Sequence, residues 1–290
     1  MFAPALVGDP HFAVLVEAAF GADPGLAVAE LPPATDAFGS WLRAVVLGGQ
    51  GRYAAARVEL RRVCNHSTDP TLLSLAGSTR GSLLRQLGWH TRAAAFDGRA
   101  AALVLATDDT TTGVARPRPA ACGPARVDAI CDALTGLAAD ALGAGRLALA
   151  GRLLRRSETA MAPDEIGWRP ALRWQWVSAE NALAAGRYLA ASRHADTALE
   201  LAESAPSVRH QVKSRLLVAA ATAARGERAR SLALVEEVAE QCRAHGLLPL
   251  QWASAMLRAG LGAEDAVSEA SDCAAAITRR GGVFCPAGAR

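Results

Sequence analysis

The chain has 290 residues, 51% of them hydrophobic and 20% charged, so it carries enough apolar side chains to bury a large core. Its net charge of +3 is too small to indicate a nucleic-acid partner. Of its 31 basic residues only Lys213 is a lysine. We interpret this arginine excess as GC-rich, actinobacterial coding; selection for guanidinium groups that bind phosphate or carboxylate is the alternative.

The six cysteines show neither CxxC pairs nor the spacing of a disulfide framework. The first residues lack the basic segment of a signal peptide, and the first positive charge is Arg43. No uninterrupted apolar run approaches the length of a membrane span. We therefore expect a cytoplasmic protein with reduced thiols and no membrane association.

Residues 1–35 are predicted to form an acidic N-terminal unit, with one helix over 10–21 and a break at Leu31-Pro32-Pro33. Residues 1–42 contain five acidic residues and no Lys or Arg. This acidic segment either docks on the basic remainder of the chain or forms a solvated face.

Helical periodicity dominates the rest of the chain. Residues 36–106 are predicted to contain two helical hairpins that turn near Gly51 and Gly88, with an Asp69-Pro70 start signal for the second. Residues 125–279 are predicted to contain four more, with turns near Gly145, Gly186, Gly226 and Gly262.

Two segments do not fit this pattern. Residues 107–124 are polar, rich in Pro, Thr and Gly, and interrupt the repeat, which is typical of a functional loop or a linker. Residues 280–290 contain Gly281-Gly282 and Pro286, and we expect a flexible tail there.

The hairpins share a signature around the turn. Gly-Arg-Tyr occurs at 51–53 and 186–188, and Gly-Arg-Leu occurs at 145–147. A small residue lies seven positions before each turn glycine: Ala44, Gly81, Ala138, Ala179, Ala219 and Ala255. Small residues let the two helices of a hairpin approach closely, and glycine ends a helix in the left-handed conformation.

Over residues 36–279 this pattern, with its period near 40 residues, resembles a divergent, long-period bacterial form of the tetratricopeptide repeat. The chain departs from that family in the large residue before the small one, which is Arg or Ser here, as at Arg43 and Ser178. The last two hairpins also lack the aromatic residue. The resemblance implies an all-α fold, a right-handed α-solenoid of about six such hairpins preceded by a short N-terminal helix.

The resemblance also implies that the first helix of each hairpin lines a concave groove. The residues that this phase nominates for binding are Trp41, Arg85, Arg173, Trp176, Glu180, Lys213 and Trp252. Arg173 and Lys213 are placed on adjacent inner helices with Trp176 beside them, where they either hold an anionic group or are ordinary solvated charges. Arg209 and His210 extend this positive strip.

The sequence shows no nucleophile elbow, phosphate loop or four-ligand metal spacing. We therefore predict no catalytic residues, no metal and no cofactor. The leading functional hypothesis is a non-enzymatic interaction or regulatory protein that binds a peptide or partner protein in its groove. The alternative is a stand-alone ligand-sensing module resembling the helical sensor domains of bacterial transcription activators. Nucleic-acid binding and catalysis rank lower, and the oligomeric state is open.

Overall fold

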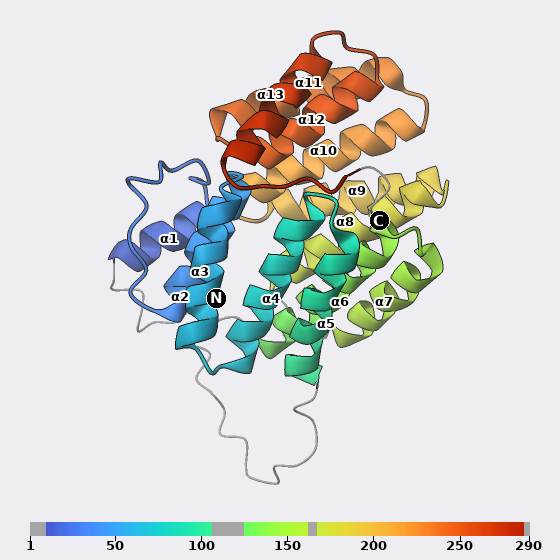
Figure 1. Ribbon diagram of the computed structural model, residues 1–290. Helices are drawn as coiled ribbons and strands as arrows, with labels where there is room; N and C mark the ends of the chain where they lie inside the picture. Colours follow the sequence, from blue (N-terminus) through green and yellow to red (C-terminus); the bar gives the residue numbers. More distant parts are fainter. Residues whose placement is uncertain (1–9, 106–124, 162–166, 287–290) are drawn as a thin grey trace.

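A computed structural model describes residues 10–105, 125–161 and 167–286, so the predicted 107–124 loop lies outside the described residues. The described residues form thirteen α-helices and no strand, which confirms the all-helical prediction (Figure 1). A short helix comes first, α1 (Pro10–Phe20). The others follow as consecutive hairpin-like pairs: α2 (Ala37–Gly49) with α3 (Tyr53–His66), α4 (Pro70–Arg85) with α5 (His90–Leu105), α6 (Arg126–Gly143) with α7 (Leu147–Ala160), α8 (Trp168–Ala184) with α9 (Tyr188–Glu203), α10 (Val208–Ala224) with α11 (Arg228–Ala244), and α12 (Leu248–Gly260) with α13 (Ala266–Arg279).

The turn inside each pair is made by a glycine in the left-handed region. All six predicted turn glycines have positive φ, from 70° at Gly186 to 84° at Gly88 and Gly226. At Gly51 the next residue, Arg52, donates its backbone N–H to the carbonyl of Leu47, which closes the end of α2. A residue with a Cβ is strained in this conformation, so these positions set where each hairpin turns.

The small residues before the turns are buried where the two helices of a pair meet. The five alanines of this set are fully buried, and Gly81 is buried as well. A Cβ at Gly81 would lie 2.4 Å from the carboxylate of Asp97 on the paired helix, so only glycine fits there. The seven-residue offset between these small residues and the turn glycines is compatible with a helical repeat.

The pairs stack so that the even-numbered helices form an inner layer. Each of α2, α4, α6, α8 and α10 contacts the next even-numbered helix as well as its neighbours in the chain. The main contacts of the odd-numbered helices are with their chain neighbours. The inner layer therefore runs continuously from α2 to α12.

The two ends of the stack meet, as the proximity of blue and red segments in Figure 1 shows. Ala54 of α3 donates its backbone N–H to the carbonyl of Arg280, and Arg280 in turn donates from its guanidinium to the carbonyl of Gln50. Past α13, Cys285 donates its N–H to Leu87, and Trp89 donates its indole N–H to Val283. The described part of the 280–290 segment thus crosses to the first two hairpins and joins the two ends of the stack into a ring.

Aromatic contacts hold α1 against this ring. Phe12 stacks on Phe38 of α2 at 5.8 Å, and Phe20 lies 5.6 Å from Trp41. The carboxylate of Glu17 accepts the N–H of Ala22 at the end of the same helix. Apolar packing is therefore the main contact of this acidic segment with the ring. None of the described helices is both long and apolar enough to cross a bilayer.

Candidate ligand-binding cavity

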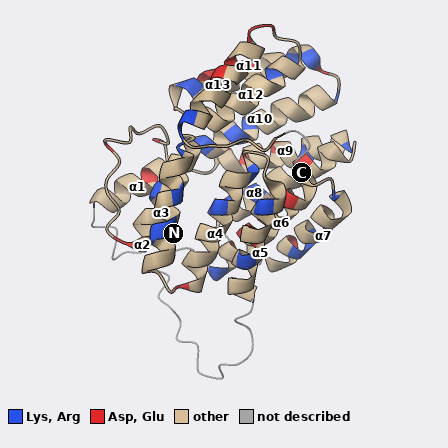
Figure 2. Ribbon diagram, in the orientation of Figure 1, with Lys and Arg blue, Asp and Glu red and all other residues tan. Residues whose placement is uncertain are grey.

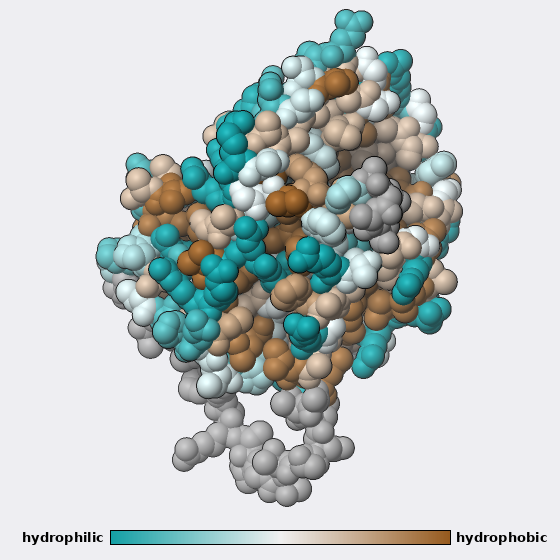
Figure 3. All heavy atoms as spheres, viewed as in Figure 1, coloured by the Kyte–Doolittle hydropathy of each residue, from teal (hydrophilic) through white to brown (hydrophobic). Residues whose placement is uncertain are grey.

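A cavity of about 450 Å³ lies at the centre of the inner layer. All six even-numbered helices contribute to its wall, together with Phe20 of α1 and Ile277 of α13. Figure 3 shows one face of the molecule, with hydrophilic residues around a small apolar area near its middle. The wall combines aromatic, aliphatic and cationic side chains, which suits an organic molecule with an apolar body.

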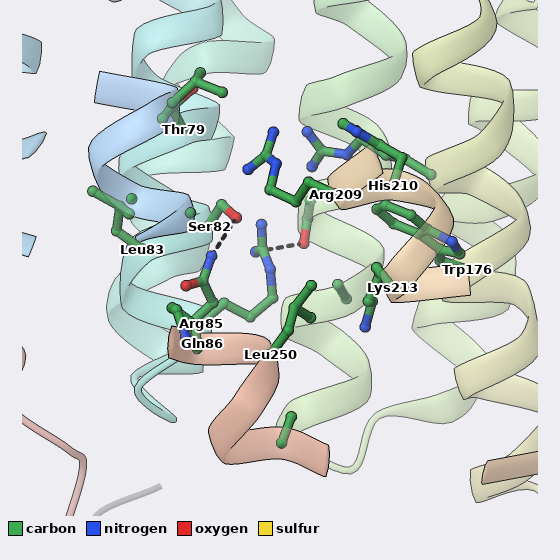
Figure 4. A pocket seen from close by; sticks show the side chains of 18 of the residues that line it. Thr79, Ser82, Leu83, Arg85, Gln86, Trp176, Arg209, His210, Lys213 and Leu250 are labelled. Atoms are coloured by element: carbon green, nitrogen blue, oxygen red, sulfur yellow. Dashed lines mark hydrogen bonds between the residues drawn. The ribbon is translucent and has the colours of Figure 1, made fainter. Parts of the chain in front are cut away.

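The structure brings all seven predicted binding residues to this one cavity: Trp41, Arg85, Arg173, Trp176, Glu180, Lys213 and Trp252. In Figure 4 Ser82, Arg85 and Gln86 lie on one side, and Arg209, His210 and Lys213 on the other. Their role in binding remains a prediction. Arg169, one helical turn before Arg173, also lines the wall and is absent from the predicted set.

Arg85 is held by two buried carboxylates behind the wall. Its guanidinium donates to Asp97 at 2.8 Å and to Asp140 at 2.5 Å. Burial raises the pKa of both carboxyl groups. The pKa of Asp140 reaches about 7, because burial and the neighbouring Asp97 raise it more than Arg85 lowers it. The two carboxylates position the Arg85 guanidinium at the cavity, and the pKa of Asp140 lies near neutral pH.

Arg169 and Arg173 share a single buried carboxylate. Asp132 of α6 pairs with Arg169 at 2.6 Å and with Arg173 at 3.3 Å. Asp132 is 2% exposed, whereas both arginines also face the cavity. Arg173 thus has a counterion on α6 that the repeat pattern does not reveal, and its role in binding stays a prediction.

Lys213 is likewise paired. Its ammonium donates to Glu180 of α8 at 2.9 Å and lies 5.7 Å from the ring centre of Trp176. Trp176 is fixed by an N–H bond to the hydroxyl of Ser214. The two predicted cations are thus joined to carboxylates of neighbouring inner helices. Lys213 has Glu180 as its own partner, whereas Arg173 shares Asp132 with Arg169.

Arg209 differs from the other cavity cations. Among the described residues it pairs with no carboxylate, and it donates a hydrogen bond to the backbone carbonyl of Ala19 at 3.4 Å. Burial, with the nearby charges of Arg173 and Arg169, lowers the pKa of Arg209 to about 10, so it stays protonated at neutral pH.

His210 forms a neutral aromatic surface next to Arg209. Burial and the charge of Arg209 hold its pKa well below the ordinary value, and its Nδ1 is bonded to the Ser207 hydroxyl. The His210 ring stacks on Trp176 at 5.3 Å with an angle of 17°. Trp176 and the buried His210 ring therefore form an apolar part of the wall beside Arg209.

The two neighbouring tryptophans of α8 have different surroundings, as their helical spacing predicts. Trp176 faces the cavity, whereas Trp174 packs toward α7 and α9, where it donates to the carbonyl of Leu154 and meets His194 edge-on. Trp252 lines the cavity and contacts Phe284 of the C-terminal segment at 5.0 Å.

No group of three or more His, Cys, Asp or Glu side chains in the described ranges is arranged to hold a metal ion. A scan against protein-family models finds no match for this chain, and no curated protein is detectably similar to it. The geometry of the cavity is thus the main guide to function.

Proposed function

We propose that this protein is a non-enzymatic, ligand-sensing helical-repeat protein that binds one small organic molecule in its central cavity. The observation that carries the proposal is that six inner helices from six hairpins surround a single cavity of about 450 Å³. This volume lies within the range of small-molecule sites, and a wall of aromatic and aliphatic side chains with a few polar groups is typical of them.

The closure of the ring favours a small molecule over the peptide that the repeat pattern first suggests. A groove that accepts a peptide is open at both ends, because the chain of the partner must enter and leave. Here the contacts of Arg280 with Gln50 and Ala54 join the last hairpin to the first. We therefore rank the ligand sensor first and a protein or peptide partner on the outer surface second.

The charge distribution gives no support to a nucleic-acid partner. Figure 2 shows Lys and Arg spread over helices on all sides, without one continuous basic face in this view. A phosphate backbone is bound by many cations along one surface. The cavity cations instead line one concave site that suits a compact ligand.

The repeat type, the handedness of the stack and the location of the protein are also proposals. We propose that the hairpins form a right-handed solenoid of six tetratricopeptide-like repeats and that the protein acts in the cytoplasm. Occupation of the cavity would brace hairpins from both ends of the chain, because α2 and α12 share its wall. Ligand binding to the folded state alone stabilises it by mass action, and this stabilisation would signal ligand binding to a partner.

A titration with N-phenyl-1-naphthylamine, an uncharged probe that fluoresces in apolar surroundings, tests the proposal. We expect saturable binding of one molecule per chain. Ala253→Phe fills part of the cavity and should weaken binding about tenfold or more. Ala229→Phe, at an exposed position of α11, is the matched control and should leave binding unchanged. Equal binding by both variants would rule out the central cavity as the site.

A further inference from the structure

The cavity holds more positive charge at one end than its own carboxylates offset. Arg85 is matched by Asp97 and Asp140, and Lys213 is matched by Glu180. At the end formed by α1, α8 and α10, three arginines face the cavity and a single carboxylate, Asp132, is bonded to two of them. Arg209 is the third, without a carboxylate partner among the described residues.

Arg209 also has hydrogen-bond donors that no described residue uses. A guanidinium has five N–H donors, and the bond to Ala19 uses one of them. Arg209 keeps some accessible surface because it extends into the cavity, as Figure 4 shows. A half-buried cation with unused donors and no carboxylate partner favours an anion that binds from outside the chain.

The backbone makes room for this side chain. A Cβ on Gly49 of α2 would lie 3.1 Å from Cδ of Arg209, closer than most such contacts, so glycine at this position lets the arginine stem pass. Arg169 lies over the rings of Phe20 and Trp41, at 5.6 and 5.8 Å. Both side chains are therefore positioned by packing from other elements rather than left loose on a surface.

Building on the proposed function, we propose that Arg209, with Arg169 and Arg173, is the anchor for the acidic group of the ligand, and that the ligand is a flat organic anion. Guanidinium forks bind the oxygens of a carboxylate, sulfonate or phosphate in pairs. The half-buried Trp176, backed by the stacked ring of His210, lies beside Arg209 and gives the apolar body of such a ligand a surface to pack on. The neutral state of His210 keeps this surface apolar.

A matched pair of probes separates the anchor from the cavity. 1-Anilinonaphthalene-8-sulfonate is N-phenyl-1-naphthylamine with one added sulfonate, so the ratio of their affinities measures the contribution of the anion. We expect the sulfonate probe to bind wild-type protein at least tenfold more tightly than the uncharged probe. We expect Arg209→Met to abolish most of that ratio while leaving the uncharged probe unaffected, and Arg209→Lys to keep part of it. Inorganic sulfate should compete with the sulfonate probe alone.

The control is Arg230→Met, an arginine on the exposed face of α11 that pairs with Glu227. It should leave both affinities unchanged. If both probes bind wild-type protein equally, the anchor is wrong and the cavity proposal stands. If neither probe binds, the proposed function fails and the anchor with it.

A purely structural role for Arg209, as a cap on the carbonyl of Ala19, makes the opposite prediction. Arg209→Met would then lower the melting temperature and leave the ratio of the two affinities unchanged. That result would overturn the proposal. An anion anchor predicts that Arg209→Met raises the melting temperature of the ligand-free protein, because an uncompensated charge is removed.

Discussion

Gly136 of α6 leaves the space in which the carboxylate of Asp97 from α5 is buried: a Cβ at position 136 would approach Asp97 Oδ1 to 2.4 Å. Arg85 holds that carboxylate in place with a hydrogen bond of 2.8 Å, so it has little freedom to move away. We predict that Gly136→Ala lowers the free energy of unfolding by about 1–3 kcal/mol through overpacking.

Gly98, next to Asp97 in sequence, is the control for this prediction, because a Cβ there meets no atom within 4 Å. Gly98→Ala should raise stability by about 0.5–1 kcal/mol, since alanine is the better helix former. Urea denaturation measures both changes. Equal effects of the two substitutions would show that Asp97 does not need the space.

The pKa of Asp140 predicts how stability depends on pH. Because its folded-state pKa is raised to about 7 from an unfolded value near 4, the folded protein binds this proton more tightly than the unfolded chain. The stabilisation is therefore fully present below pH ~4 and is lost as pH rises toward 7. Asp140→Asn mimics the protonated group, so its stability relative to wild type should rise by about 1–3 kcal/mol between pH 4 and pH 8.

Chemical denaturation at several pH values checks this difference. Asp272→Asn, on an exposed part of α13, serves as the control for the loss of one carboxylate. Its difference in unfolding free energy from wild type should be the same at each pH. A flat difference for Asp140→Asn as well would mean that Asp140 is ionised throughout this range.

The C-terminal segment is predicted to hold the ring closed. A chain that ends at Arg279 loses the backbone bonds from Ala54 to Arg280 and from Cys285 to Leu87. We expect faster hydrogen exchange at the start of α3 and at the turn before α5, and a loss of about 2–4 kcal/mol of stability, since each bond contributes on the order of 1 kcal/mol. Unchanged exchange at these two places would show that other contacts close the ring.

Arg258 provides a comparison for Arg209. Its guanidinium, 5% exposed, pairs with Glu236, Asp265 and Glu269. Arg258→Met should lower the free energy of unfolding by about 1–3 kcal/mol; partners that remain in contact with water limit the loss. The same substitution at Arg209 should not destabilise the protein. Denaturation curves of the two variants measure this difference. An equal loss of stability in both would contradict the prediction.

Local signals predict the hairpins well. The helix bounds follow from apolar periodicity and from glycines such as Gly51 and Gly186, whose positive φ is a property of a few neighbouring residues. The repeat phase then brings residues as distant as Trp41 and Trp252 to one wall, because it specifies which helix of each pair faces inward.

Long-range pairing is what the sequence does not reveal. Asp132 binds Arg169 and Arg173 from another helix, and its choice of partner depends on side-chain packing rather than on spacing. The closure of the ring through Arg280 and Gln50 joins residues far apart in the chain and has no periodic signature. For that reason a groove along an open stack was expected, where the structure joins the first and last hairpins around a cavity.

Native mass spectrometry with 1-anilinonaphthalene-8-sulfonate tests the central claim most directly, because it counts bound molecules on the intact chain. The account predicts one adduct per chain for the wild type and for Ala229→Phe, and little or none for Ala253→Phe. Several adducts of similar strength on the wild type, or an adduct that survives in Ala253→Phe, would contradict a single binding site at the centre of the ring.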